Sequence, residues 1–250
     1  MRDTAAGEKM GYWIPLLFII FAGGAVHSIT GFGCGLVIMI VLPHLMPMTQ
    51  AAAMSTITGG ILSASLIWRY RGKLDPRFVI LTAIPYLAVS VTMLQFVRRI
   101  DTRVMAIVFG AFLVLIGLYY IILSGKAHLR ITPVTMLVCP AVSGLTSALF
   151  GIGGPLMSLL YLEKYETRAE YASNLQMLFF ISAVTNTTTR VINGIITTDL
   201  LPTAAAGVAA ILLGKRVGLY FADRMKPDLL RKAVYLMVLF SGVITILNNI

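Results

Sequence analysis

The fold of this chain is decided by residues 10–68, which read MGYWIPLLFIIFAGGAVHSITGFGCGLVIMIVLPHLMPMTQAAAMSTITGGILSASLIW. This stretch contains no Asp, Glu, Lys or Arg, and a soluble domain cannot bury so long an uncharged run. Across all 250 residues, 58% are hydrophobic and 12% are charged. An ordinary soluble domain carries about 25% charged residues. We therefore expect an all-α polytopic membrane protein with the lipid bilayer as its solvent.

Apolar segments of helical length continue along the whole chain, with the same arrangement in each half. They cover residues 12–30, 34–46, 51–68, 78–97 and 104–123, and then 133–150, 153–162, 169–189, 200–221 and 233–249. A helix needs about 20 apolar residues to cross a bilayer core, so the second segment of each half is short. The sequence leaves open whether these short segments cross the bilayer or re-enter it.

The two halves of the chain resemble each other in detail. Residues 30–35 (TGFGCG) correspond to residues 150–155 (FGIGGP), and each stretch lies between a full-length segment and a short one. Further along, residues 51–56 (AAAMST) match residues 169–174 (AEYASN). The common order of these features indicates a duplication.

The positive residues predict how the two repeats are oriented, because Lys and Arg accumulate in cytoplasmic loops. If each half crosses an odd number of times, 14 of the 20 Lys and Arg lie on one side of the membrane. An even number of crossings splits them 11 to 9, which is no bias. We therefore predict two inverted repeats, residues 1–125 and 126–250, with both termini in the periplasm. Secondary transporters often have this architecture and bind their substrate near the bilayer midplane.

The Gly-rich stretches are expected to interrupt helices at depth in the membrane. An irregular backbone is tolerated there only where protein or a water-filled cavity satisfies it. Each break also begins a short helix, whose free N–H groups and positive dipole end can bind an anion. The alternative is that the glycines only allow helices to pack closely. The candidate substrate-binding residues in the breaks are Gly31, Phe32, Gly33, Cys34, Gly35, Gly151, Gly153 and Gly154.

Polar side chains follow each break on the next segment of the same half. A membrane helix usually turns such side chains toward a pathway or a bundle interior. They are candidates for binding an oxyanion, and the alternative is that they hydrogen-bond neighbouring helices. The candidates are Ser55 and Thr56 in the first half and Asn174 and Gln176 in the second, with Thr58 and Ser173 beside them.

Two further residues have a possible role in transport. Arg190 follows an uncharged run and is a candidate for attracting an anion at the outer mouth by bidentate contact. Its alternative role is to snorkel to the interface. His27 precedes the first break and is a candidate for proton coupling, since its charge changes near neutral pH. The alternative is a neutral histidine within a helix interface.

Several function classes lack support in the sequence. The net charge of +10 lies in short basic runs between apolar segments, which are topology signals, so we expect no nucleic-acid partner. Acidic residues inside the segments are confined to one polar loop around Glu163, Glu166 and Glu170, which argues against a carboxylate relay or a metal site. The motifs of zinc proteases, serine hydrolases and P-loop ATPases are absent. We expect no enzymatic activity and no cofactor.

The two glycine motifs carry a resemblance to a known family. Residues 31–36 (GFGCGL) with Pro43 downstream, and residues 151–155 (GIGGP) in the second half, resemble the TauE/SafE family of sulfite and organosulfonate exporters. The resemblance covers nearly the whole chain, from about Tyr12 to Leu247. It implies transport of a small sulfur-containing anion across a bacterial inner membrane.

The sequence thus favours a secondary transporter, an exporter of sulfite or an organosulfonate, working by alternating access. An inside-negative membrane potential favours anion efflux, so no coupling ion is required. The alternatives are a proton-coupled importer of a small organic anion that uses His27, and a membrane assembly factor without transport. Small residues at Gly207, Gly214 and Gly218 can serve either packing within the chain or a homodimer interface.

Overall fold

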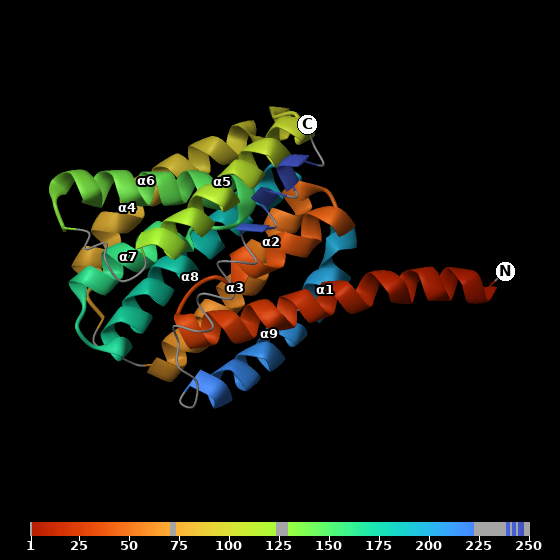
Figure 1. Cartoon of the computed structure of the whole chain (residues 1–250), viewed down its shortest axis with the longest axis horizontal. Helices are drawn as coiled ribbons and strands as arrows, with labels where there is room; N and C mark the ends of the chain where they lie inside the picture. The colour runs from red at the N-terminus through yellow and green to blue at the C-terminus, as the bar shows by residue number, and fades with distance from the viewer. Residues whose placement is uncertain are drawn as a thin grey trace.

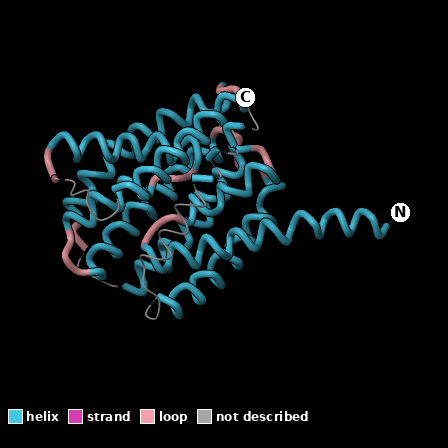
Figure 2. Tube along the Cα trace, viewed as in Figure 1, coloured by secondary structure: helices cyan, strands magenta, loops and turns pink. Residues whose placement is uncertain are grey.

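The structure is a computed structural model, which describes residues 2–70, 74–123, 130–222, 239–240, 242–243 and 245–247. Its described residues form helices joined by short loops, with no strand among them (Figure 2). The helices are α1 (Arg2–Thr30), α2 (Cys34–Leu45), α3 (Met48–Tyr70), α4 (Pro76–Phe96), α5 (Thr102–Leu123), α6 (Pro133–Phe150), α7 (Gly154–Lys164), α8 (Arg168–Ile192) and α9 (Leu201–Ala222). Single 3-10 turns lie at Val97–Arg99 and Thr198–Leu200.

The predicted segments agree with these helices to within three residues at nearly every end. The exception is α1, which begins at Arg2 rather than at residue 12 and extends beyond the bundle (Figure 1). Hydropathy gives no signal for this extension because residues 2–9 are mostly polar or small. The last predicted segment, 233–249, lies outside the described residues apart from the three short stretches named above.

Six helical stretches of the described chain are long and apolar enough to cross a membrane, which confirms a polytopic membrane protein. They are Trp13–Thr30, Met48–Tyr70, Pro76–Arg99, Thr102–Tyr119, Pro133–Phe150 and Thr198–Phe221. Helix α8 has 25 residues, yet it is too polar to belong to this set. It packs between other helices, with α3 and α4 as its main neighbours. Most of its polar residues are therefore covered by protein rather than by lipid.

The main helix pairs join the two halves of the chain. Helix α1 packs on α9, α4 on α6, and α3 on α8. If α1 corresponds to α6 and α4 to α9, the first two pairs are equivalent, as a duplication requires. The inverted orientation of the repeats stays a prediction.

Glycines allow the closest of these approaches. A Cβ on Gly214 or Gly218 would overlap the backbone of α1 at Phe21 or Ala25. A Cβ on Gly144 of α6 would overlap the carbonyl of Tyr86 on α4. The small residues of α9 therefore serve packing within the chain. They no longer support the predicted homodimer.

Two arginines of α8 mark where the short helix α2 runs. Arg168, at the start of α8, donates to the carbonyl of Ile29 near the end of α1 over 3.4 Å. Arg190, near the other end of α8, donates to the carbonyl of Thr49 at the start of α3, also over 3.4 Å. Helix α2 connects these two contacts and, with 12 residues, is shorter than a helix that crosses a bilayer core.

Candidate substrate site

The two Gly-rich breaks interrupt the helices where the sequence predicts. Helix α1 ends at Thr30 and α2 begins at Cys34, while α6 ends at Phe150 and α7 begins at Gly154. Gly31, Gly33 and Gly151 have positive φ values of 85°, 99° and 66°. Residues with a Cβ rarely adopt this left-handed conformation, so glycine is required to turn the chain here.

The breaks lie against each other in the middle of the molecule. A Cβ on Gly35 would lie 2.7 Å from the carbonyl oxygen of Gly151, so the second glycine motif leaves no room for a side chain in the first. The Ser55 hydroxyl of α3 donates to this same Gly151 carbonyl over 3.1 Å. The two breaks therefore contact each other directly and through Ser55.

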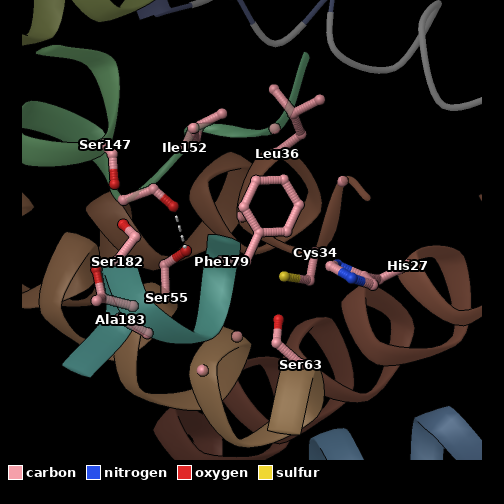
Figure 3. A pocket seen from close by; sticks show the side chains of 18 of the residues that line it. His27, Cys34, Leu36, Ser55, Ser63, Ser147, Ile152, Phe179, Ser182 and Ala183 are labelled. Carbon is pink, nitrogen blue, oxygen red and sulfur yellow. Dashed lines mark hydrogen bonds between the residues drawn. The ribbon is translucent and has the colours of Figure 1, made fainter. Parts of the chain in front are cut away.

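A small cavity, here called the central cavity, lies where the breaks meet (Figure 3). Its volume is about 60 Å³. Because one water needs about 10–15 Å³ on the same measure, it has room for roughly four waters or one small oxyanion. Among the described residues, no Asp, Glu, Lys or Arg lines it. Predicted site residues that line it are His27, Gly33, Cys34, Gly35, Ser55, Thr56, Gly151, Gly153 and Gly154.

Two helix N-termini open onto the central cavity. Neither α2 nor α7 has a side-chain cap, because the N-cap residues are Gly33 and Gly153. In α2, the first backbone bond of the helix runs from Val37 N–H to the Gly33 carbonyl. The N–H groups of the three residues before Val37 therefore precede the helical ladder, and these residues line the cavity. Such an end carries partial positive charge and binds anions without a charged side chain.

The C-terminal ends of α1 and α6 lie beside the same cavity and carry the opposite partial charge. Guanidinium groups from α8 offset both of them. Arg190 donates to the carbonyls of Ala148 (2.6 Å) and Ser147 (3.4 Å) near the end of α6. Arg168 donates to the carbonyl of Ile29 near the end of α1. The partial negative charge of both carbonyl ends is thus offset beside the cavity.

Most of the predicted hydroxyl donors are already used within their own helices. Thr56 donates to Ala52 over 2.8 Å, and Thr58 donates to Met54 over 2.7 Å. Ser173 likewise donates to the Ala169 carbonyl of its own helix. These hydroxyls retain lone pairs but have no proton left for an anion.

Ser63 is one of the cavity hydroxyls that sequence reasoning missed. It lies on α3, is 1% exposed, and its Oγ has no hydrogen-bond partner in the described structure. Figure 3 shows its hydroxyl pointing to the same part of the cavity as the Cys34 thiol and the His27 ring. The sequence could have indicated Ser63, because Thr56, Gly60 and Ser63 are spaced by four and three residues and therefore share one face of a helix. Burying a hydroxyl without a hydrogen-bond partner costs free energy unless a ligand or a water forms a hydrogen bond with it.

Other lining residues were not predicted either. Tyr86 comes from α4 and lies beside Ser147 and Ser182. Phe179 and Ala183 of α8 complete an apolar part of the wall. None of these residues lies in a glycine motif, and their convergence depends on how α4, α6 and α8 pack.

Five predicted substrate contacts lie away from the central cavity: Gly31, Phe32, Asn174, Gln176 and Arg190. Asn174 accepts from the backbone N–H of Asp75 (2.7 Å) and donates to Glu170 (2.9 Å), so it positions the start of α4. Phe32 is buried against Gly154, and Gly31 packs against Tyr171. Neither residue lines the central cavity.

Arg190 differs from both sequence-based interpretations. It is 0% exposed and lies against the carbonyls of α6, so it neither snorkels to an interface nor lies open at an outer mouth. It does not line the central cavity. Hydropathy places an arginine after an apolar run at an interface, but here the helix end of α6 provides buried acceptors for it.

His27 and Gln176 form a hydrogen-bonded chain to the first break. Gln176 Nε2 donates to the Gly31 carbonyl over 2.8 Å, and Gln176 Oε1 lies 3.1 Å from His27 Nε2. Because a carbonyl can only accept, the amide orientation is fixed and His27 Nε2 is assigned the proton. His27 is 2% exposed, and its Nδ1 has no partner in the described structure.

A second, larger cavity, here called the vestibule, lies on the other side of the hydrogen-bonded His27 and Gln176 side chains, toward the α7–α8 loop. Its volume is about 260 Å³. It is lined by His27, Ser28, Ile29, Thr30, Gly31, Leu66, Tyr70, Leu162, Tyr165, Glu166, Thr167, Arg168, Tyr171, Ala172 and Gln176. The charge pattern predicts that the α7–α8 loop is cytoplasmic. Gln176 and Gly31, two of the predicted site residues, thus lie at the vestibule rather than at the central cavity.

Comparison with known proteins bears directly on this arrangement. The model of the family "Sulfite exporter TauE/SafE" matches residues 16–245. The chain belongs to the TauE/SafE family. A probable sulfite/organosulfonate exporter TauE from Cupriavidus necator is 23% identical to it over 238 residues, which cover 92% of this chain and 93% of that protein. No solved structure matches the chain.

Membership in the TauE/SafE family confirms the resemblance carried by the glycine motifs. TauE/SafE proteins are transporters, so the chain is a transporter rather than an enzyme. Together with the six apolar helices, membership also confirms a multi-pass protein of the inner membrane. Most of the residues that carry the resemblance, 33–36 and 151–155, line the central cavity.

Proposed function

We propose that this protein exports a small sulfur-containing oxyanion, sulfite or a short organosulfonate, and that the central cavity is its substrate site. One observation carries the proposal: two uncapped helix N-termini and the unpartnered Ser63 hydroxyl meet at a cavity that no charged side chain of the described residues lines. Backbone N–H groups can only donate hydrogen bonds, and a hydroxyl can donate one as well. A ligand that accepts from all of them is best supplied by an anion. The name of the Cupriavidus necator relative agrees with this substrate class.

The geometry favours a compact anion with several oxygens. Residues at the start of both α2 and α7 line the cavity, and Ser63 supplies a donor from α3. A pyramidal or tetrahedral oxyanion can accept from such donors at the same time. With a volume of about 60 Å³, the cavity suits sulfite or a one- or two-carbon sulfonate better than an aromatic sulfonate.

Alternating access provides the transport mechanism of the proposal. Inverted repeats bind substrate between them and expose it to each side in turn. An inside-negative potential favours efflux of an anion by about 2.3 kcal/mol per charge per 100 mV. The neutral site therefore needs no coupling ion to export its substrate.

The proposal can be tested with the purified protein in two steps. Sulfite, methanesulfonate and sulfoacetate should raise its melting temperature in detergent, while toluenesulfonate should not. In proteoliposomes, flux of labelled sulfite should follow an imposed membrane potential without a pH gradient, and empty liposomes are the control. Stabilisation by none of the small sulfur anions would refute the substrate class.

A second candidate, proton-coupled transport, rests on the His27 ring. Its Nδ1 is buried without a partner beside the central cavity, so it is placed to accept a proton from a protonated anion or to carry one. The other titratable residues lining the two cavities are Cys34 and Tyr86 in one, and Tyr70, Tyr165, Glu166, Arg168 and Tyr171 in the other. Flux that stops when only the pH gradient is removed, and that becomes independent of it in His27→Gln, would favour this mechanism over potential-driven export.

A further inference from the structure

The central cavity and the vestibule meet at one side chain. His27 lines both of them, while the other lining residues belong to one or the other. Gln176 and Gly31 line the vestibule on the far side of His27. The two spaces are therefore separated by His27 and the groups hydrogen-bonded to it.

This separation consists of side chains held by two hydrogen bonds. Gln176, on α8, reaches across to α1 and binds both the His27 ring (3.1 Å) and the carbonyl of Gly31 (2.8 Å). The Gly31 carbonyl lies in the break, outside the helical ladder of α1. Moving the amide away therefore leaves the helical hydrogen bonds of α1 and α8 in place.

We infer that the bridge from His27 through Gln176 to Gly31 is the partition that closes the substrate site to the vestibule, and that Gln176 is the positioning residue that holds it shut. This inference rests on the proposed function for the identity of the site, but it concerns access to the cavity rather than what binds there. The vestibule is the route by which an anion reaches the cavity from the side of the α7–α8 loop. Arg168 lies at its exposed edge, where it attracts anions.

The native Cys34 thiol provides a probe of this partition. Cys34 lines the central cavity but not the vestibule. The chain has two cysteines, so a Cys139→Ser background leaves Cys34 as the single thiol. A reagent that enters through the vestibule can reach Cys34 only after the partition has moved.

The experiment measures the rate at which a membrane-impermeant, charged methanethiosulfonate modifies Cys34 in oriented vesicles. In Gln176→Ala, we expect modification from the vestibule side to be at least tenfold faster than with Gln176 present, and modification from the other side to be unchanged. Gln176→Ser should give the same result, so the test does not depend on one variant folding. A second background, Cys34→Ser, Cys139→Ser and Arg168→Cys, reports which face of the vesicles carries the vestibule.

Asn174→Ala is the matched control. Asn174 is also a buried amide of α8, but it binds Asp75 and Glu170 and lines neither cavity. A variant that merely loosens the protein should resemble Asn174→Ala. Equal acceleration in the Asn174 and Gln176 variants, or no acceleration in either Gln176 variant, would overturn the inference.

The assay contains no substrate, so its result is independent of the proposed function. Faster labelling of Cys34 with no binding of sulfur anions would retain the partition and reject the substrate. Binding of sulfite with unchanged labelling would retain the substrate and reject the partition.

Discussion

The Ser55 hydroxyl donates a hydrogen bond of 3.1 Å to the carbonyl oxygen of Gly151, so a helix of the first half completes the break of the second. The reverse contact is also present, because Gln176 of α8 donates to the carbonyl of Gly31 over 2.8 Å. Each half thus satisfies a backbone group that the other half exposes by interrupting a helix. The interrupted backbone is tolerated at depth because the partner half covers it.

Removing the Ser55 hydroxyl should therefore destabilise the bundle. Ser55→Ala leaves the Gly151 carbonyl with one acceptor bond fewer, and we expect a loss of about 1 kcal/mol in the free energy of unfolding. Reversible denaturation in mixed micelles measures this difference. Thr188→Val is the control, since Thr188 is exposed and its hydroxyl bonds only to Val184 of its own helix. Equal losses in the two variants would contradict a special role of the Ser55 contact.

Ser63→Ala should separate binding from stability. The Ser63 Oγ has no partner in the described structure, so its removal should change the free energy of unfolding by less than about 0.5 kcal/mol. A hydrogen bond to a charged group contributes about 1.5 kcal/mol, so sulfite affinity should fall roughly tenfold. Isothermal titration and thermal denaturation give the two quantities. Thr58→Val, which removes a hydroxyl bonded to Met54, should retain the affinity; unchanged affinity in Ser63→Ala would exclude Ser63 from the site.

The contact between Gly153 and Tyr86 predicts a suppressible defect. A Cβ on Gly153 would overlap the Tyr86 hydroxyl, so Gly153→Ala should lose about 1–3 kcal/mol of stability and most of the flux. Tyr86→Phe removes the overlapping oxygen and should restore part of the stability in the double variant. A double-mutant cycle measures the coupling between the two positions. Additive losses would mean that Gly153 is required for another reason.

Arg190 has a structural and an electrostatic role that two substitutions can separate. Arg190→Gln removes donors from the buried carbonyls of α6 and also a positive charge near the cavity, so both stability and sulfite affinity should fall. Arg190→Lys keeps the charge but not the planar donor arrangement, so it should lose stability while retaining most of the affinity. Calorimetry of each variant, with and without sulfite, makes the comparison. Equal affinity in the Gln and Lys variants would exclude a role for the charge.

The sequence predicted the elements well because helix ends in this chain have local causes. The breaks need glycine at positive φ, and Gly31, Gly33 and Gly151 are visible without any structure. Hydropathy located the apolar helices for the same reason, since lipid acts on each segment separately. It gave no sign of the start of α1 at Arg2, where the residues are polar.

The site was predicted less completely because its lining depends on packing. Ser63 and Tyr86 lie on helices without a motif, and only the contact of α3, α4 and α8 brings them to the breaks. Asn174 and Gln176 are two residues apart on one helix, so they point in different directions, one toward Asp75 and the other toward His27. A polar residue in a membrane helix predicts a buried partner, but the sequence alone does not identify that partner.

The polarity of α8 has a consequence for how the protein is made. A helix with Asn174, Gln176, Asn186 and Arg190 among its residues does not partition into lipid by itself, because polar side chains are costly there. It must enter the bilayer against surfaces that accept those side chains, and α1, α4 and α6 supply most of their hydrogen-bond partners. Insertion of α8 during synthesis is therefore coupled to assembly with helices already released into the membrane. Substitutions on the α8-facing sides of α1, α4 and α6 should cause failures of biogenesis before any failure of transport.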